Sequence, residues 1–393
     1  MIQTVLVASV PYPSLELPLL GLRLLDRILI PAKKSGLTHV LFLSREPHPV
    51  LPEEFCVIFP DVLLDKNLWK KLQETDRPPE TVSYSSEVTS CLFFRTQKTQ
   101  KVLEGLRENP TPAQFLEKMK SHLSVESLSF QKKEWFRIQS PEDVPRCEQW
   151  LLKGLIKDSE GFMSRHLERK ISLFVTKILI WSPVTPNAMT LISTGVGLAG
   201  ATLFISPSSL VQTIGASLFW VHSVLDGCDG EIARLKFLES RWGGILDFWS
   251  DNAVHAAVFS FIAAGLAKRE PALLPSLLGL SAVACTLLSA GFVYVKTMKN
   301  KKGTGPLFTS VIDPNLNRTR SHPEGSKVQK IADFLARRDF IYLVLVLAFF
   351  GKIHWFLWMG AVGSPLYFLA LIWFNRKESQ LSEVVSFSSV GAR

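Results

Sequence analysis

Residues 226–251 read DGCDGEIARLKFLESRWGGILDFWSD and contain four aspartates in two pairs. Asp226 and Asp229 stand three positions apart, and Asp247 and Asp251 stand four apart. The stretch lies between long apolar runs that are typical of membrane helices. Because carboxylates at membrane depth are costly unless they pair or bind a ligand, these four are candidates for function. Their spacing predicts that each pair lies on one face of its own helix.

The composition of the 393-residue chain changes along its length. Residues 1–150 show mixed strand and helix periods, whereas residues 187–376 hold several apolar runs long enough to span a bilayer. The formal net charge of +9 fits a membrane protein with basic cytosolic loops. No dense Lys/Arg patch is interleaved with aromatic residues, so nucleic acid is not an expected partner. The five cysteines include no CxxC, which argues against a disulfide framework and a zinc site.

Strand-like and helix-like segments alternate over residues 1–150. This order predicts an α/β domain in which a parallel sheet is covered on both faces. Gly36 is expected to end the first helix. The expected strands are 4–10, 39–44, 56–61, 91–96 and 134–138, and the expected helices are 20–35, 68–74, 98–107, 112–121 and 141–158.

The rest of the chain predicts an all-α membrane domain. Residues 151–182 form a linker with a basic amphipathic helix at the membrane interface, where Trp181 would sit at headgroup level. Residues 183–378 would form a six-helix transmembrane domain, and residues 379–393 a disordered tail. The fifth span would continue a cytosolic helix that starts near Lys327. The six expected spans are 187–205, 210–235, 243–266, 272–296, 337–352 and 355–376.

The distribution of basic residues predicts the orientation in the membrane. The 296–338 connection is rich in Lys and Arg, which favours the cytosolic side and places both termini and the N-terminal domain there. We expect an integral protein of a bacterial or archaeal inner membrane.

Four carboxylates on two facing helices would assemble one pocket near the cytosolic ends of the helices. Oxygen ligands in this number suit Mg²⁺ or Mn²⁺, and two such ions can clamp a phosphoryl group. The small residues Gly230, Ala233 and Gly243 would let a ligand approach the backbone. Arg234 lies beside the acidic face, where it could neutralise phosphate oxygens.

The pattern D-x2-D-G-x2-A-R-x8-G-x3-D-x3-D resembles the signature of the CDP-alcohol phosphotransferase (phosphatidyltransferase) family, over residues 160–376. TPNAMT at 185–190 is similar to the family's usual entry sequence. The resemblance implies a homodimeric membrane enzyme in which an acceptor alcohol attacks the β-phosphate of a CDP-alcohol and CMP leaves.

The same resemblance assigns roles to individual residues. It implies metal ligands at Asp226, Asp229 and Asp247, and a general base at Asp251 that also borders two metal ions. Residues that would line the CDP pocket are Asn187, Thr190, Gly230, Ala233, Arg234 and Gly243.

The acceptor would be a polyol or polyol phosphate, with an inositol-phosphate-like molecule favoured. Lys296, Arg337 and Arg338 should lie at cytosolic helix ends, where they could bind an acceptor phosphate. The alternative is that they only reflect the excess of basic residues on the cytosolic side.

Residues 1–150 resemble a sugar-nucleotide nucleotidyltransferase, with Asp61 of FPDV in the metal position. The glycine-rich loop that cradles triphosphate is missing after the first strand, where the sequence is VASVPYPSLELP. This implies a degenerate domain. The fusion of the two domains resembles the bifunctional inositol-phosphate cytidylyltransferase / di-inositol-phosphate-phosphate synthases. The donor could therefore be CDP-inositol or CDP-diacylglycerol.

Three alternatives stay open at this point. The N-terminal domain could still make the CDP-alcohol, which would give a bifunctional enzyme. A metal-dependent transporter would need polar residues at matching depth in several other spans, and spans one, four and six contain almost none. A membrane scaffold without activity would leave an unused and destabilising acid cluster.

Overall fold

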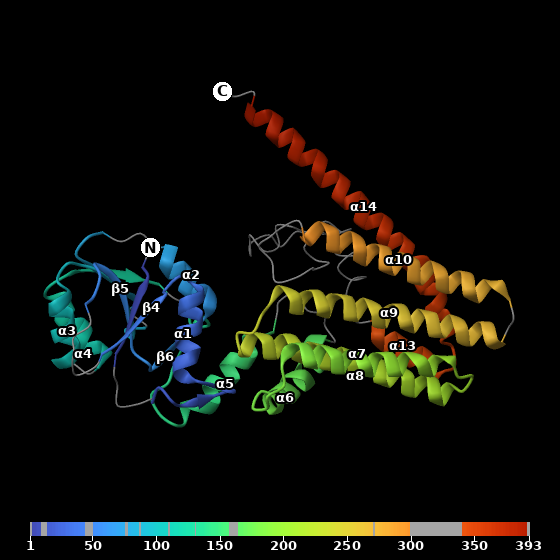
Figure 1. Cartoon of the computed structure of the whole chain (residues 1–393), viewed down its shortest axis with the longest axis horizontal. Coiled ribbons are helices and arrows are strands. Elements are labelled where there is room, and N and C mark those ends of the chain that lie inside the picture. The colour runs from blue at the N-terminus through green and yellow to red at the C-terminus, as the bar shows by residue number, and fades with distance from the viewer. Residues whose placement is uncertain are drawn as a thin grey trace. The chain divides into compact units, whose positions relative to one another are not determined.

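We analysed a computed structural model of the 393-residue chain. The structure describes residues 2–8, 14–43, 50–74, 78–85, 88–108, 111–129, 131–156, 164–269, 272–298 and 340–390. The chain divides into two compact units, Met1–Leu155 and Ile156–Arg393. The first unit contains a mixed β-sheet with helices, and the second is helical (Figure 1).

The first unit is built on a six-stranded sheet in the order β4-β1-β5-β8-β7-β9. β1 pairs in parallel with β4 and β5, and β7 pairs in parallel with β9, whereas β8 runs antiparallel to both of its neighbours. The strands are β1 (Thr4–Val7), β4 (His39–Phe42), β5 (Glu54–Ile58), β7 (Thr81–Ser85), β8 (Cys91–Arg95) and β9 (Ser124–Leu128).

The expectation of a parallel sheet is therefore wrong, and the sheet is mixed. The reason is β7, whose sequence TVSYS does not form an apolar run and is absent from the expected strands. Only residues 86–90 connect β7 to β8, and a connection this short makes a hairpin rather than the crossover that parallel strands need.

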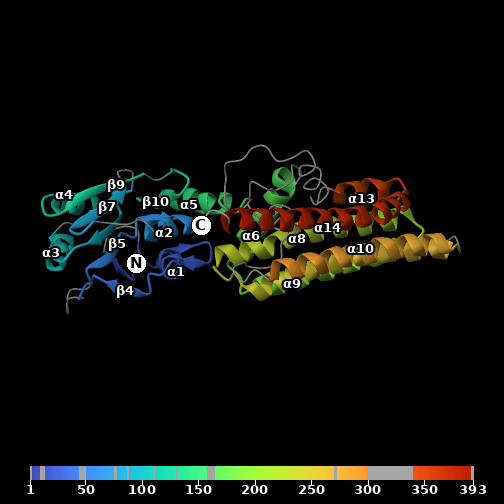
Figure 2. The ribbon, with the colours of Figure 1, turned by 90° about the horizontal axis from the view of Figure 1, so that it is seen from above.

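Helices cover both faces of this sheet, as the sequence predicted. One core cluster joins Val5, Val7 and Ile58 to α1 and α2, and the other joins Leu6, Val57 and Phe94 to α3 and α4. Figure 2 shows α3 and α4 apart from α1 and α2. The helices are α1 (Leu24–Lys34), α2 (Lys66–Glu74), α3 (Thr99–Glu108), α4 (Pro112–Lys120) and α5 (Asp143–Lys153).

The first helix begins later than expected because a short hairpin precedes it. β2 (Pro18–Leu19) and β3 (Leu22–Arg23) pair through a turn in which Leu20 and Gly21 have positive φ angles of 47° and 79°. α1 ends at Lys34 with Ser35 as its C-cap, and Gly36 follows with a φ of 110°, which confirms that this glycine terminates the helix. A second small ribbon pairs β6 (Val62–Leu64) with β10 (Trp135–Arg137).

The second unit is helical, and each of the six expected spans contains a helix. A π-helical turn at Ser164–Glu168 comes first and is followed by α6 (Arg169–Leu179). α7 to α10 lie along a common direction (Figures 1 and 2). The remaining helices are α7 (Pro186–Thr202), α8 (Ser209–Leu235), α9 (Arg241–Arg269), α10 (Leu273–Met298), α13 (Phe340–Phe349) and α14 (His354–Val390).

Among the described residues, three helices are long and apolar enough to cross a membrane: Pro186–Ile205, Leu273–Met298 and His354–Trp373. α8 and α9 are of similar length but carry the aspartates, and α13 is apolar but short. Leucine and tryptophan side chains such as Leu277, Leu280 and Trp358 are exposed on these helices, as on a surface that faces lipid. The helical unit therefore belongs to a membrane-associated protein.

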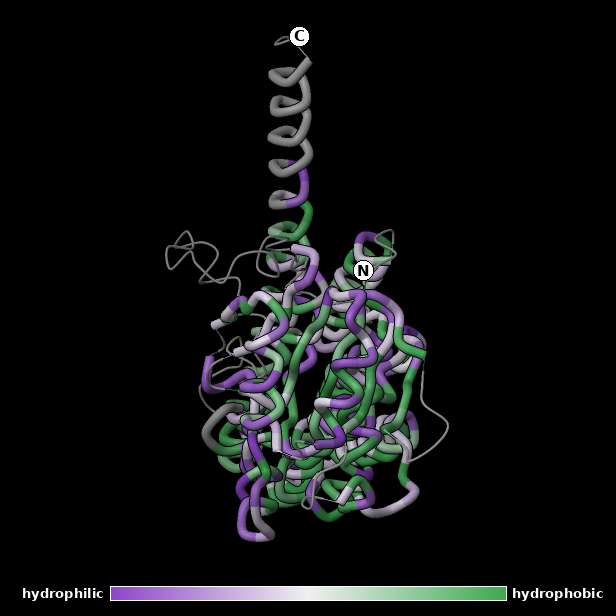
Figure 3. Tube along the Cα trace, turned by 90° about the vertical axis from the view of Figure 1, so that its left-hand side faces the viewer, coloured by the Kyte–Doolittle hydropathy of each residue, from purple (hydrophilic) through white to green (hydrophobic). Residues whose placement is uncertain are grey.

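The C-terminal helix differs from expectation. α14 continues to Val390, whereas a disordered tail was expected from residue 379. No Pro or Gly interrupts residues 366–390, so the sequence offers no helix breaker there. Figure 3 shows green, apolar turns of α14 followed by a purple, polar turn, before the part of the helix that is drawn in grey. The cytosolic helix expected near Lys327 lies outside the described residues.

Candidate metal centre

Three of the four aspartates meet in the helical unit. Asp226 and Asp229 on α8 and Asp247 on α9 each present a carboxylate oxygen, and these atoms lie within 4.8 Å of one another. Asp226 and Asp229 are 5% and 6% exposed. Asp247 is half-buried. Three carboxylates this close, two of them shielded from water, repel one another unless a cation lies between them. The donor set consists of hard oxygen atoms and fits Mg²⁺ or Mn²⁺.

Residues of α7 close the cluster on one side. The Thr190 hydroxyl donates a hydrogen bond to the Asp229 carboxylate, and Thr190 is buried. Near the start of the same helix, the Asn187 amide oxygen lies 3.2 Å from the position that a Cβ atom on Gly243 would occupy. Gly243 therefore lets α9 approach α7 closely, next to the acids.

Asp251 does not join this group of three. Its carboxylate lies 3.7 Å from Nε2 of His222, a buried histidine on α8. The other ring nitrogen of His222 lies 2.9 Å from the carbonyl oxygen of Ser193. Because a carbonyl oxygen only accepts hydrogen bonds, this contact directs Nε2 towards Asp251.

The other residues expected at the site do not belong to the cluster of three aspartates. The Arg234 guanidinium lies 3.1 Å from where a Cβ atom on Gly230 would be, so this glycine makes room for the arginine over α8. Ala233 is half-buried on the same helix. Lys296 is exposed near the end of α10. Arg337 and Arg338 lie outside the described residues.

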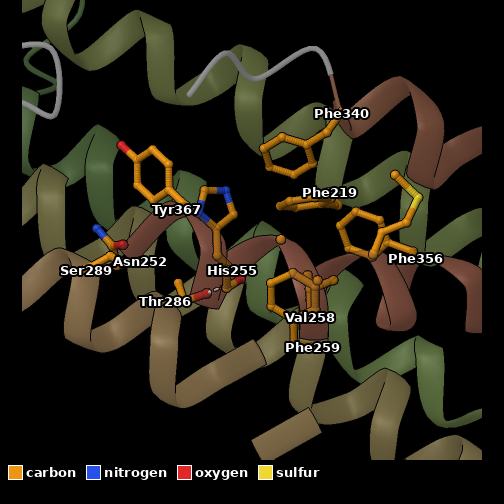
Figure 4. Close-up of a pocket in the computed structure, with 14 residues that line it drawn as sticks. Phe219, Asn252, His255, Val258, Phe259, Thr286, Ser289, Phe340, Phe356 and Tyr367 are labelled. Atoms are coloured by element: carbon orange, nitrogen blue, oxygen red, sulfur yellow. Dashed lines mark hydrogen bonds between the residues drawn. The ribbon is translucent and has the colours of Figure 1, made fainter. Parts of the chain in front are cut away.

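A cavity of about 280 Å³ opens between α8, α9, α10, α13 and α14. Its lining is mostly aromatic and aliphatic, with a smaller polar part. Asn252, Ser289 and Tyr367 lie towards one side and Phe219, Phe340 and Phe356 towards the other (Figure 4). Asn252 directly follows Asp251, so the polar part adjoins the helix turn that carries the expected base.

The first unit holds the other expected metal residue, Asp61, between β5 and β6. Its carboxylate accepts hydrogen bonds from the Ser90 hydroxyl and the Arg137 guanidinium, both at 2.9 Å. Arg137 therefore supplies a positive charge directly beside the carboxylate that the resemblance assigns to a metal ion.

One neighbour of the site was not predicted from the sequence, Glu231 on α8, which is fully buried. The signal for Glu231 was present, because it is another acid at membrane depth. It was overlooked because it does not belong to the spaced aspartate pattern.

The apolar helices and the acid cluster define a helical, membrane-associated unit with three carboxylates close enough together to bind a cation. Residues 183–316 match the family model described as CDP-alcohol phosphatidyltransferase. This match confirms, for residues 183–316, the resemblance that the aspartate pattern indicated.

Curated relatives carry two kinds of name. A "Bifunctional IPC transferase and DIPP synthase" of Thermococcus kodakarensis is 28% identical over 205 residues, which is 51% of this chain and 44% of that protein. A protein of the same name from Aquifex aeolicus is 34% identical over 33% of this chain and 29% of its own length. A "Phosphatidylinositol phosphate synthase" of Corynebacterium glutamicum is 30% identical over 33% of this chain and 57% of that protein. The chain thus spans less than half the length of the two bifunctional relatives.

The solved structures that match include phosphatidylinositol phosphate synthase (PgsA1) of Mycobacterium tuberculosis. The crystal structure with CDP-DAG bound is 21% identical, with a TM-score of 0.35, and covers 52% of this chain and 94% of that one. A second structure of this enzyme, in complex with manganese and citrate, is 18% identical with a TM-score of 0.34 and covers 52% and 88%.

Proposed function

We propose that this protein is a metal-dependent transferase that moves a substituted phosphate group from a CDP-alcohol to a polyol or polyol phosphate and releases CMP. The observation that carries the proposal is the cluster of the buried Asp226 and Asp229 with the half-buried Asp247, inside the segment that matches the family model. We further propose a six-span domain over residues 183–378, a cytosolic N-terminal unit over residues 1–150 and a homodimer.

Asp226, Asp229 and Asp247 would hold Mg²⁺ or Mn²⁺, two ions in our proposal, with Asp251 at the border. When bound, the metal supplies positive charge for the pyrophosphate oxygens. Arg234 would add a second positive charge near the leaving CMP. Asn187, Thr190, Gly230, Ala233 and Gly243 would form the walls of the nucleotide pocket.

Asp251 would act as the general base. It takes the proton of the acceptor hydroxyl while that oxygen forms a bond to the β-phosphorus and the bond from this phosphorus to the CMP oxygen breaks. A position outside the cluster of three carboxylates suits this role, because the Asp251 carboxylate oxygen can then stay directed towards the acceptor. Lys296, Arg337 and Arg338 would bind an acceptor phosphate.

The cavity beside Asp251 favours CDP-diacylglycerol over CDP-inositol as donor. Its aromatic part would accept an apolar chain, and a soluble CDP-polyol has none to place there. The contact between Asp61 and Arg137 supports the same choice, because it argues against a nucleotide-binding metal site that could make CDP-inositol in this chain.

The test is CMP release by the purified full chain in detergent with Mg²⁺ or Mn²⁺. CDP-diacylglycerol and CDP-inositol are each offered with inositol, inositol phosphate and glycerol phosphate. We expect metal-dependent release with CDP-diacylglycerol and a polyol phosphate, and loss of at least a hundredfold in kcat for Asp251→Asn. Release with CDP-inositol alone would reject the lipid donor, and no release from folded, metal-binding protein would reject the transferase.

A further inference from the structure

Glu231 is a buried acid that the proposed chemistry does not use. It lies on α8 two residues after Asp229 and is fully buried. A helix turns about 100° per residue, so the Glu231 side chain leaves α8 about 170° from the mean direction of Asp226 and Asp229. It therefore belongs to the back of the helix and not to the metal cluster.

Among the residues that the structure describes, the hydrogen-bond partners of Glu231 come from α6. Oε1 accepts hydrogen bonds from the Arg169 guanidinium at 2.8 Å and the Ser172 hydroxyl at 2.6 Å, and Oε2 accepts one from the Thr176 hydroxyl at 2.7 Å. The donors stand at positions i, i+3 and i+7, which is one face of a helix. A carboxylate bound in this way fixes both the position and the rotation of α6 against α8.

The backbone of α8 is shaped for this contact. A Cβ atom on Gly227 would lie 2.9 Å from the Arg169 guanidinium and 3.5 Å from Cβ of Ser172. The Cys228 thiol lies 3.5 Å from the carbonyl oxygen of Ser172. Gly227, Cys228 and Glu231 share the face opposite the aspartates, so α6 packs along the back of the metal-bearing segment.

A second polar contact connects the π-helical turn before α6 to α13. The Tyr342 hydroxyl on α13 donates to the Glu168 carboxylate at 3.1 Å and accepts from the Trp220 indole of α8 at 3.3 Å. The opposite side of α6 exposes Phe174 and Ile178. The helix thus has one face bonded to α8 and one face available to lipid.

We propose that Glu231 is a positioning residue: its three hydrogen bonds lock α6 to the back of α8 and so hold Asp226 and Asp229 at the orientation that binds the metal. This role rests on the proposed function. Hydrogen bonds are directional, so they fix the rotation of α8 about its axis, which apolar contacts alone would leave free to vary.

The test separates positioning from stability with methionine variants of the full chain in detergent. Replacing one partner of a buried ion pair leaves the other uncompensated, whereas replacing both with apolar residues often restores stability. Glu231→Met, Arg169→Met and the double variant are compared with Lys170→Met, which removes a charge from an exposed position next to Arg169. The readouts are melting temperature, the Mn²⁺ dissociation constant by electron paramagnetic resonance, and kcat and KM for CMP release.

We expect Glu231→Met to melt earlier and to bind Mn²⁺ about tenfold more weakly, in the range found for residues behind metal ligands. The double variant should regain melting temperature but not Mn²⁺ affinity, and Lys170→Met should match the wild type in both. If Glu231→Met does not fold, Glu231→Gln, which keeps the shape but loses the charge, gives the same comparison with a smaller shift.

Recovery of Mn²⁺ affinity together with melting temperature in the double variant would overturn the positioning role, as would unchanged affinity in Glu231→Met or Glu231→Gln. Wild-type protein that binds Mn²⁺ without releasing CMP would reject the transferase function alone, because the affinity comparison does not need turnover. Wild-type protein that binds no Mn²⁺ would reject both.

Discussion

The hydroxyl of Thr190 on α7 donates a hydrogen bond to the carboxylate of Asp229 on α8. The family resemblance placed Thr190 in the nucleotide pocket, and the structure places it behind one of the three clustered acids. A donor at this position lowers the energy of the ionised carboxylate and fixes its orientation. Thr190 thereby ties the start of the first long apolar helix to the acid cluster.

We expect Thr190→Val to weaken metal activation about tenfold or more, because valine keeps the shape of threonine but cannot orient Asp229. The measurement is the Mn²⁺ concentration that gives half-maximal CMP release. Thr194→Val is the matched control, since the Thr194 hydroxyl donates to the Thr190 carbonyl within the same helix at 2.6 Å. An unchanged Mn²⁺ midpoint in Thr190→Val would show that the contact has no part in metal binding.

The pairing of Asp61 with Arg137 leads to a prediction about the first unit. Asp61→Asn removes the charge partner of Arg137 and weakens the contact with Ser90, so we expect a loss of about 1–3 kcal/mol in the stability of this unit. CMP release from supplied CDP-alcohol should not change. Thermal unfolding and CMP release of the full chain give the two readouts.

The bifunctional alternative predicts a different outcome for the same variant. If Asp61 holds a metal for nucleotidyl transfer, wild-type protein should consume CTP and Asp61→Asn should abolish that reaction. Glu54→Gln is a suitable control, because its partly exposed ion pair with Arg95 at 3.3 Å also lies in this unit. Exposed pairs contribute little, so this control should unfold close to the wild-type temperature.

The sequence predicted the helices better than the sheet. Long apolar periodicity located α7, α8, α9 and α10 to within a few residues, because a helix in lipid must satisfy its own backbone over its whole length. Strands β7 and β9 were missed. β9 lies at the edge of the sheet and is largely exposed, so its sequence SVESL carries no apolar alternation.

At the candidate site too, one part could be predicted from the sequence and another could not. Helix geometry converts sequence distance directly into direction, so the spacing predicts that Asp226 and Asp229 share one face of α8. The short connection between α8 and α9 favours a hairpin, and in the structure Asp247 of α9 joins these two acids. The contacts of Glu231 with α6 could not be derived in this way. They depend on how two helices distant in sequence pack, which the spacing within one helix does not determine.

The thiol of Cys147 on α5 offers a pH-dependent test of the first unit. Burial raises the pKa of Cys147 to about 12, so the thiol stays protonated in the folded protein where an unfolded chain would ionise near pH 9. This group favours folding below pH 9, and its contribution is lost as the pH rises from about 9 to about 12. At pH 9 we expect iodoacetamide to label Cys147 at least about a hundredfold more slowly in intact than in denatured protein, by peptide mass spectrometry. Equal rates would contradict a buried thiol.

The cavity beside Asp251 can be filled from Gly363 on α14, because a Cβ atom there would meet no other atom within 4 Å. Gly363→Leu should raise KM for long-chain CDP-diacylglycerol about tenfold and change KM less for a short-chain analogue, since leucine occupies space that the chain would use. Gly195→Leu on α7 is the matched control: it also has open space at Cβ and does not line the cavity. The measurement is KM for both donors, determined from CMP release, and it tests whether the cavity holds the chain of the donor. Equal effects of Gly363→Leu on both donors would place the chain elsewhere.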